Sequence, residues 1–209
     1  MRQYLVLFTA VLFSMGAKAQ MANSLSLNGY GGYTFRDKVD FDIAYAYANA
    51  AFQYGGGLEY FIQRTNSVEI KYLRMDTHLP LYLANNTHVN SGNDKGSVQY
   101  ILADFTEYFG SSSSKAVPYG GLGLGAGIVS IKDGNSTTKF AWDAKLGVKI
   151  KTASALSINL QAYMQSIIST FGSDYWVYPG GAVVAVPDYA TLFQFGLGAV
   201  LSYNFSKHQ

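Results

Sequence analysis

Six isolated charged residues lie in stretches where polar and apolar residues alternate, and they are the first candidates for chemistry. Successive strand side chains point to opposite faces, so each charge shares its face with glycine, serine, glutamine or asparagine. Ammonium and carboxylate groups on such a face can form ion pairs, or they can line a path for ions. The six are Glu59, Glu69, Lys71, Asp143, Lys145 and Lys149.

A second group could support hydrolysis, because it offers a hydroxyl, two imidazoles and a carboxylate. Asp76, His78, His88 and Ser91 all lie in or near one connection. A nucleophile, its base and an orienting acid need defined mutual geometry, so we expect solvated loop residues and no catalysis. The chain has no cysteine, and the two histidines are ten residues apart. This spacing does not form a metal-ligand cluster, and we expect no metal and no cofactor.

A third group is aromatic and comprises Tyr175, Trp176 and Tyr178, within an apolar stretch at 174–187. One interpretation is a hairpin that extends the flanking strands and turns at 179–181, where the sequence is Pro-Gly-Gly. The other is a surface patch that binds a protein, a glycan or lipopolysaccharide.

The elements that position these residues are strands. The stretch 191–205 places apolar or aromatic residues at every second position, from Phe193 to Phe205. A helix would scatter these residues around its circumference. The faces of the third and fourth strands are unclear near 73–75, where a bulge would explain the loss of phase, and near 102–103. The eight alternating segments are 24–35, 51–63, one beginning near 68, 98–109, 118–131, 139–151, 156–166 and 191–205.

The connections are short after the second, fourth and sixth segments and long after the first, third and seventh. The two kinds of connection therefore gather at opposite ends, and both termini lie at the short-turn end. Eight antiparallel strands have two exposed edges unless the last pairs with the first, and closure into a barrel removes them.

Composition limits what surrounds this barrel. Only 13% of the 209 residues are charged, and 15% are aromatic, whereas soluble domains have about 25% charged residues.

Residues 1–19 have the features of a cleaved signal peptide, with Arg2 before an apolar core and Ala17 and Ala19 before the cut. Residues 20–209 then form one barrel domain. Its formal charge is zero, because the +2 of the whole chain includes Arg2 and Lys18. A neutral chain without basic runs does not indicate nucleic-acid binding.

Alternation does not decide which face points outward, and a soluble lipocalin-like barrel would turn its apolar face inward around a ligand. Three features favour an outward apolar face. The polar face has few charges, aromatic residues gather at strand ends, and loop lengths alternate strictly, as in membrane barrels.

The chain resembles the small outer-membrane β-barrels of Gram-negative bacteria, of OmpA/OmpX type. The resemblance rests on the glycine-alternating stretch 118–125 and on the closing stretch 194–205. It departs from the family pattern because residues 206–209 follow the last aromatic, Phe205. The resemblance implies an all-β, eight-stranded, antiparallel, up-and-down transmembrane barrel in the bacterial outer membrane. Its implied partners are outer-membrane lipids, lipopolysaccharide and the barrel-assembly machinery.

An eight-stranded barrel is just wide enough for side chains to fill it. We therefore expect the six charges to form a salt-bridge network in a filled lumen, and a structural or surface-interaction role. One alternative is a narrow channel for ions or small solutes, lined by the same charges. A second is a lipid-modifying enzyme, since some barrels of this size use His with Ser and an acidic residue.

Overall fold

The structure is a computed structural model. Residues 1–19, where the signal peptide is expected, fall outside the part that it describes. Within 174–177 and 183–186 it describes the backbone alone. The described residues are 22–40, 44–89, 94–110, 114–132, 134–152, 154–168, 174–177, 183–186 and 191–205.

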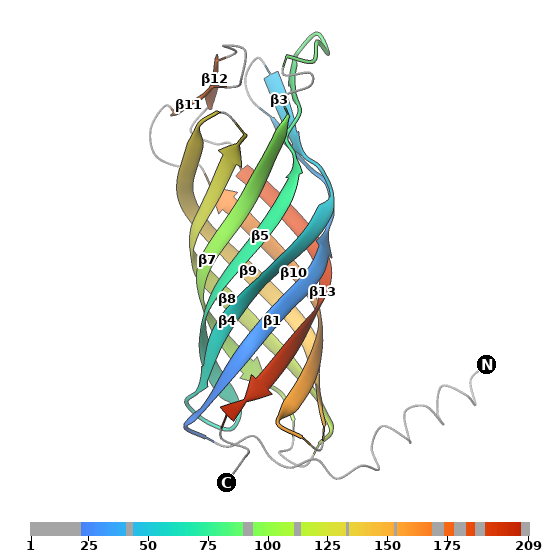
Figure 1. Cartoon of the computed structure of the whole chain (residues 1–209), viewed down its shortest axis with the longest axis vertical. Coiled ribbons are helices and arrows are strands. Elements are labelled where there is room, and N and C mark those ends of the chain that lie inside the picture. Colours follow the sequence, from blue (N-terminus) through green and yellow to red (C-terminus); the bar gives the residue numbers. More distant parts are fainter. Residues whose placement is uncertain are drawn as a thin grey trace, which may run out of the picture.

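Eight strands close into an antiparallel barrel in which the first strand pairs with the last (Figure 1). This closure confirms the fold class predicted from the sequence. Asn204 near the end of the last strand also donates side-chain hydrogen bonds to Ser24 and Ser26 of the first. The barrel strands are β1 (Ser24–Thr34), β4 (Ala51–Phe61), β5 (Asn66–His78), β7 (Lys95–Tyr108), β8 (Ala116–Ile131), β9 (Ser136–Lys151), β10 (Leu156–Ile168) and β13 (Thr191–Asn204).

The long connections contain strands of their own, which the sequence analysis treated as loops. β2 (Asp37–Asp40), β3 (Ala44–Ala48) and β6 (Leu81–Leu83) form a three-stranded sheet beyond one end of the barrel. β11 (Asp174–Val177) and β12 (Val183–Val186) pair as a separate two-stranded sheet at the same end (Figure 1). We call this the long-loop end, and the opposite end the short-turn end.

The expected bulge near 73–75 is wrong. β5 pairs without interruption with β7 from Asn66 to His78, and with β4 from Ser67 to Met75. The polar–apolar alternation fades there for another reason, which is that the lumen itself is apolar at this height. Leu73 and Met75 point inward and are buried with Tyr100 of β7.

The outer wall is apolar around the middle of the barrel. Its most exposed side chains include Ile70 at 69%, Leu122 at 66% and Leu146 at 69%. Exposed aromatic rings lie toward both ends, such as Tyr60 near the short turns and Phe52 near the long connections. Among the described residues, no helix has the length and apolar character that a membrane span requires.

Candidate functional site

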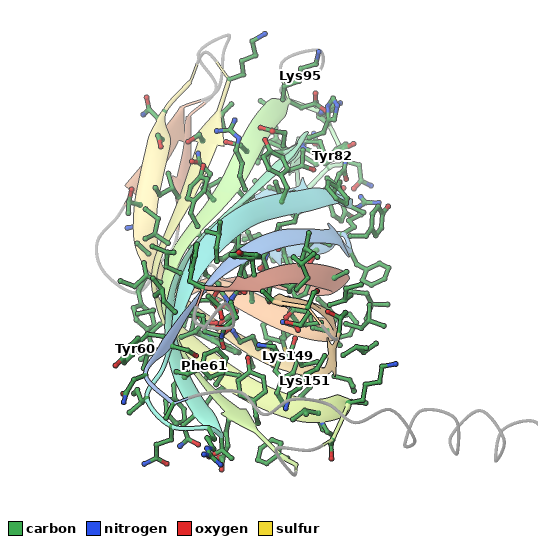
Figure 2. The ribbon with its side chains drawn as sticks, turned by 60° about the horizontal axis from the view of Figure 1, so that its bottom comes forward. Tyr60, Phe61, Tyr82, Lys95, Lys149 and Lys151 are labelled. Carbon is green, nitrogen blue, oxygen red and sulfur yellow. The ribbon has the colours of Figure 1, made fainter. Side chains whose placement is uncertain are left out.

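The candidate site is the lumen, where side chains form three layers. An aromatic layer at the short-turn end consists of Phe61, Tyr108, Val117 and Tyr119. An apolar layer fills the long-loop end, where the alanines of β3 pack on inward residues of the barrel. Charged residues lie between the two layers. Figure 2 shows Phe61 and Lys149 near the short turns, and Tyr82 and Lys95 near the opposite end.

The charged layer is centred on Lys71. Its ammonium group lies 2.6 Å from Asp104 Oδ2 and 2.5 Å from Asp143 Oδ2. Lys145 bridges this pair to the next carboxylate, at 2.7 Å from Asp104 and 3.3 Å from Glu69. All five side chains are nearly inaccessible to solvent. Such a network binds four strands together, because its members come from β5, β7 and β9 and contact residues of β1.

Neutral donors coordinate two of the carboxylates, Glu69 and Glu59, whereas Asp104 Oδ1 and Asp143 Oδ1 are buried without a hydrogen-bond partner among the described residues. The Asn28 amide donates to Glu69 at 2.7 Å, and the Tyr30 hydroxyl donates to the same oxygen at 2.5 Å. Ser67 and Tyr108 each donate to Glu59 at 2.6 Å. A buried charge is costly unless its partners satisfy it, so these hydrogen bonds are required to keep the carboxylates inside the barrel.

Lys149 joins the charged layer to the aromatic layer. Its ammonium group lies 3.9 Å from Glu59 Oε2. It also lies 4.8 Å from the ring centre of Phe61 and 5.0 Å from that of Tyr108, which are distances typical of cation–π contacts. The short-turn end is therefore closed by rings packed around a paired cation.

All six charged residues singled out from the sequence lie buried in the lumen. Two further charges are buried there. Sequence reasoning missed Asp104, and it placed Lys151 on the polar face of 139–151 without including it among the six candidates. Asp104 was missed because its strand, β7, has inward apolar residues at Tyr100 and Leu102, which hide the alternation. In the structure Asp104 pairs with Glu69 across β5 and β7 and points inward, as does Thr106. With these two, the described lumen holds four lysines and four carboxylates.

Two glycines of β8 make room for this layer. A Cβ atom at Gly121 would come within 2.8 Å of Lys145 Cε and within 2.9 Å of Thr106 Oγ1. A Cβ atom at Gly123 would overlap the carboxylates of Asp104 and Asp143, which pair with it from either side. The glycine column thus leaves the space in which the ions meet.

The lumen leaves little free space at the level of these ions. One cavity, bordered by Tyr30, Lys71 and Asp143, has a volume of about 10 Å³, which is room for roughly one water molecule. Above it, Gln53, Gln165 and Gln194 are linked by side-chain hydrogen bonds of 3.2 and 3.4 Å. A hydrated ion does not fit through such a cross-section without moving side chains.

Among the described residues, the hydrolytic candidates contact other residues and not one another. Asp76 and His78 lie on the same outer face of β5, but Asp76 is paired with Arg74 at 2.7 Å. His78 instead contacts Asp94, with 2.9 Å between Nδ1 and Oδ1. His88 stacks on the ring of Tyr82 at 4.7 Å. Among the described residues no serine hydroxyl is hydrogen-bonded to either imidazole, and Ser91 lies outside them.

The aromatic loop candidates fall in the second extra sheet. Tyr175 and Trp176 belong to β11, where their backbones pair with Ala185 and Val184 of β12. Tyr178 and the expected turn at 179–181 lie outside the described residues. β11 and β12 form a sheet of their own, so the hairpin predicted here is not a continuation of the barrel strands.

Comparison by sequence gives no relative, since no protein-family model matches the chain and no curated protein does either. Comparison of structures does find similar proteins. The structure is similar to Neisserial surface protein A, with 14% identity, a TM-score of 0.58, and coverage of 87% of this chain and 97% of the other. It is also similar to the outer membrane protein OprG from Pseudomonas aeruginosa, with 13% identity, a TM-score of 0.58, and coverage of 88% and 98%. These similarities confirm the fold that the sequence resemblance implied, that of small eight-stranded outer-membrane barrels.

Proposed function

We propose that this chain, which has the fold of the small eight-stranded outer-membrane barrels, is an integral outer-membrane protein with a closed lumen. Its barrel serves as a rigid scaffold that displays the long-loop end at the cell surface, in a structural or surface-interaction role. In this proposal residues 1–19 direct export, and the short turns and both termini face the periplasm.

The outer wall supports membrane insertion. Ile70, Leu122 and Leu146 are more than 60% exposed, and side chains of this size would be unfavourable over so wide a band in water. The backbone groups of all eight strands are paired in the closed sheet, as hydrocarbon requires. The fold shared with Neisserial surface protein A and OprG supports the same placement.

The filled lumen is the observation that carries the structural role. Four lysines and four carboxylates are buried there, and Lys71 alone contacts two carboxylates at 2.6 Å or less. Charges that are paired with each other and enclosed by apolar and aromatic layers stabilise a scaffold. Charges that serve a channel would face open water.

The absence of catalysis is part of the proposal. Asp76 is engaged by Arg74, and no serine hydroxyl of the described residues is hydrogen-bonded to His78 or His88, so these residues contain no serine–histidine nucleophile–base pair. A surface-interaction role gains support from the tyrosines of the three-stranded sheet. Tyr45 stacks on Tyr82 at 5.3 Å on the side of that sheet opposite its buried alanines.

Conductance tests the closed lumen. We expect the refolded protein to give no discrete current steps in planar bilayers at neutral pH, because the ion pairs and the two capping layers fill the cross-section. Flotation with lipid vesicles shows separately that the same preparation inserts. Reproducible ion-selective steps that change when Lys71 is replaced would contradict the proposal and favour the narrow channel.

A further inference from the structure

The outer wall of three adjacent strands, β5, β7 and β8, changes from apolar to polar between the short-turn end and the long-loop end. Outward residues paired across these strands form six rows. We call the first three the apolar rows and the last three the polar rows. In order they are Val68, Phe105, Leu122; Ile70, Ala103, Leu124; Tyr72, Ile101, Ala126; Arg74, Gln99, Ile128; Asp76, Ser97, Ser130; and His78, Lys95, Lys132.

The polar rows border one depression of about 560 Å³, whose lining includes the basic side chains of Arg74, His78, Lys95 and Lys132. Ser97 and Ser130 also line it. Ser97 is 5% exposed and its hydroxyl accepts a hydrogen bond from Gln99 at 3.3 Å, and the Ser130 hydroxyl pairs with that of Ser136 at 2.9 Å. In Figure 2 Lys95 lies at the end of the barrel opposite Lys149. The depression is thus a basic surface at the long-loop end of the outer wall.

Two described carboxylates near this surface, Asp76 and Asp94, are already engaged. Asp76 accepts two hydrogen bonds from Arg74, at 3.0 and 2.7 Å, and one from the Tyr54 hydroxyl at 2.8 Å. Asp94 is 2.9 Å from His78. Among the described residues, no carboxylate lies within ion-pair distance of Lys95 or Lys132. These two lysines face each other across the β7–β8 pairing, where Lys132 N donates to the Lys95 carbonyl at 2.8 Å.

The first two apolar rows form a shallow groove on the same strands, and the third row, Tyr72, Ile101 and Ala126, separates this groove from the polar rows. The groove has a volume of about 640 Å³ and is lined by Val68, Ile70, Phe105, Leu122 and Leu124. Ala103 lies on its floor and leaves it open. An apolar wall below two lysines that have no carboxylate partner among the described residues matches the chemistry of one kind of molecule, which has an anionic head and hydrocarbon chains.

We propose that this wall binds a phosphorylated lipid of the outer leaflet, with its headgroup phosphate between Lys95 and Lys132 and its acyl chains along the apolar rows, beginning at Tyr72, Ile101 and Ala126. Charge-assisted hydrogen bonds from ammonium groups to phosphate are among the strong ones in proteins. The site rests on the proposed membrane placement, because that placement sets the apolar rows at the depth of acyl chains.

The test titrates fluorescent bisphosphorylated lipid A against the mature full-length protein in detergent micelles. The Lys95→Gln/Lys132→Gln variant is expected to bind about tenfold or more weakly, since each lysine near an anionic lipid surface contributes about a fivefold factor. The Arg64→Gln/Lys115→Gln variant carries the same charge change in the short turns and should bind like wild type. The Lys95→Arg/Lys132→Arg variant should retain most of the affinity.

Two further probes separate the sources of phosphate. Dephosphorylated lipid A should bind the wild type as weakly as bisphosphorylated lipid A binds the glutamine variant, and inorganic pyrophosphate should not displace lipid A at equal concentration. Equal affinities of the glutamine variant and its control for bisphosphorylated lipid A would overturn the site. So would equal affinities of the wild type for dephosphorylated and bisphosphorylated lipid A. Displacement by pyrophosphate would replace the lipid site with a free-anion site. A chain that stays dissolved without detergent would instead overturn the proposed function, before any titration.

Discussion

Replacement of Lys71 by methionine is expected to lower the free energy of unfolding by about 3–5 kcal/mol, the cost of removing one partner from a buried ion pair. Lys71 contacts Asp104 and Asp143, and the three side chains are 0–3% exposed. In the variant Asp104 still has Lys145 at 2.7 Å as an ion-pair partner. Asp143 has no other ion-pair contact among the described residues, so it is left unpaired. Urea unfolding of the protein refolded into lipid vesicles measures the change.

The Asp143→Asn change in the same background should restore part of that stability, because an amide is less costly to bury than an unpaired carboxylate. The two single variants and the double variant form a thermodynamic cycle, and we expect a coupling free energy of about 1–3 kcal/mol. If Lys71→Met unfolds like wild type and Asp143→Asn changes nothing further, the lumen is hydrated and the closed-barrel account is wrong.

Replacement of Ile70 by lysine is expected to cost about 2–4 kcal/mol, the range for a basic residue on the lipid face near the bilayer midplane. Ile70 is 69% exposed and lies one row from Tyr72 toward the short-turn end. In water the same change at so exposed a position would be nearly neutral. Unfolding of the variant in vesicles, compared with wild type, gives the difference.

Thr138→Lys provides the matched control. Thr138 is exposed on β9 and pairs with Ile128 of the polar rows, so a lysine there should cost less than about 1 kcal/mol. Equal and small costs at both positions would indicate that water surrounds the wall at both heights.

Strand faces could be predicted wherever the lumen is polar. On β13 and β4 small or polar residues alternate with large apolar ones, as at Gln194 between Phe193 and Phe195, and the structure buries the first and exposes the other two. One face of each strand lines a narrow interior and the other forms the outer wall. This difference in surroundings produces the period-two pattern in the sequence. Closure followed from the even strand number and the cost of open edges.

The same signal disappears where both faces are apolar. Leu73, Met75 and Tyr100 point into the apolar layer, while Tyr72 and Ile101 point outward. No pattern of polarity separates the two sets, so the neighbouring Asp104 could not be assigned to the lumen. The ion pairs themselves also depend on register between strands, which a single sequence does not specify.

The three-stranded sheet at the long-loop end has a signal in the sequence. Residues 44–48 read Ala-Tyr-Ala-Tyr-Ala, and the structure buries the alanines while the tyrosines stay partly exposed. The small residues let the sheet approach the barrel mouth and pack on the apolar layer. Here small and large residues alternate without a change in polarity. A search for polar–apolar alternation therefore does not find this strand.

Adjacent single-cysteine variants give the most direct test of which way the wall faces. The chain has no native cysteine, so Leu201→Cys and Ser202→Cys can each take one nitroxide label in protein refolded into vesicles. Leu201 is 55% exposed and Ser202 is 1% exposed. We predict that the label at 201 is reached by oxygen dissolved in lipid but not by a water-soluble nickel complex, and that position 202 is labelled only after unfolding. A label at 201 that the nickel complex reaches freely, as in a barrel surrounded by water, would contradict the account.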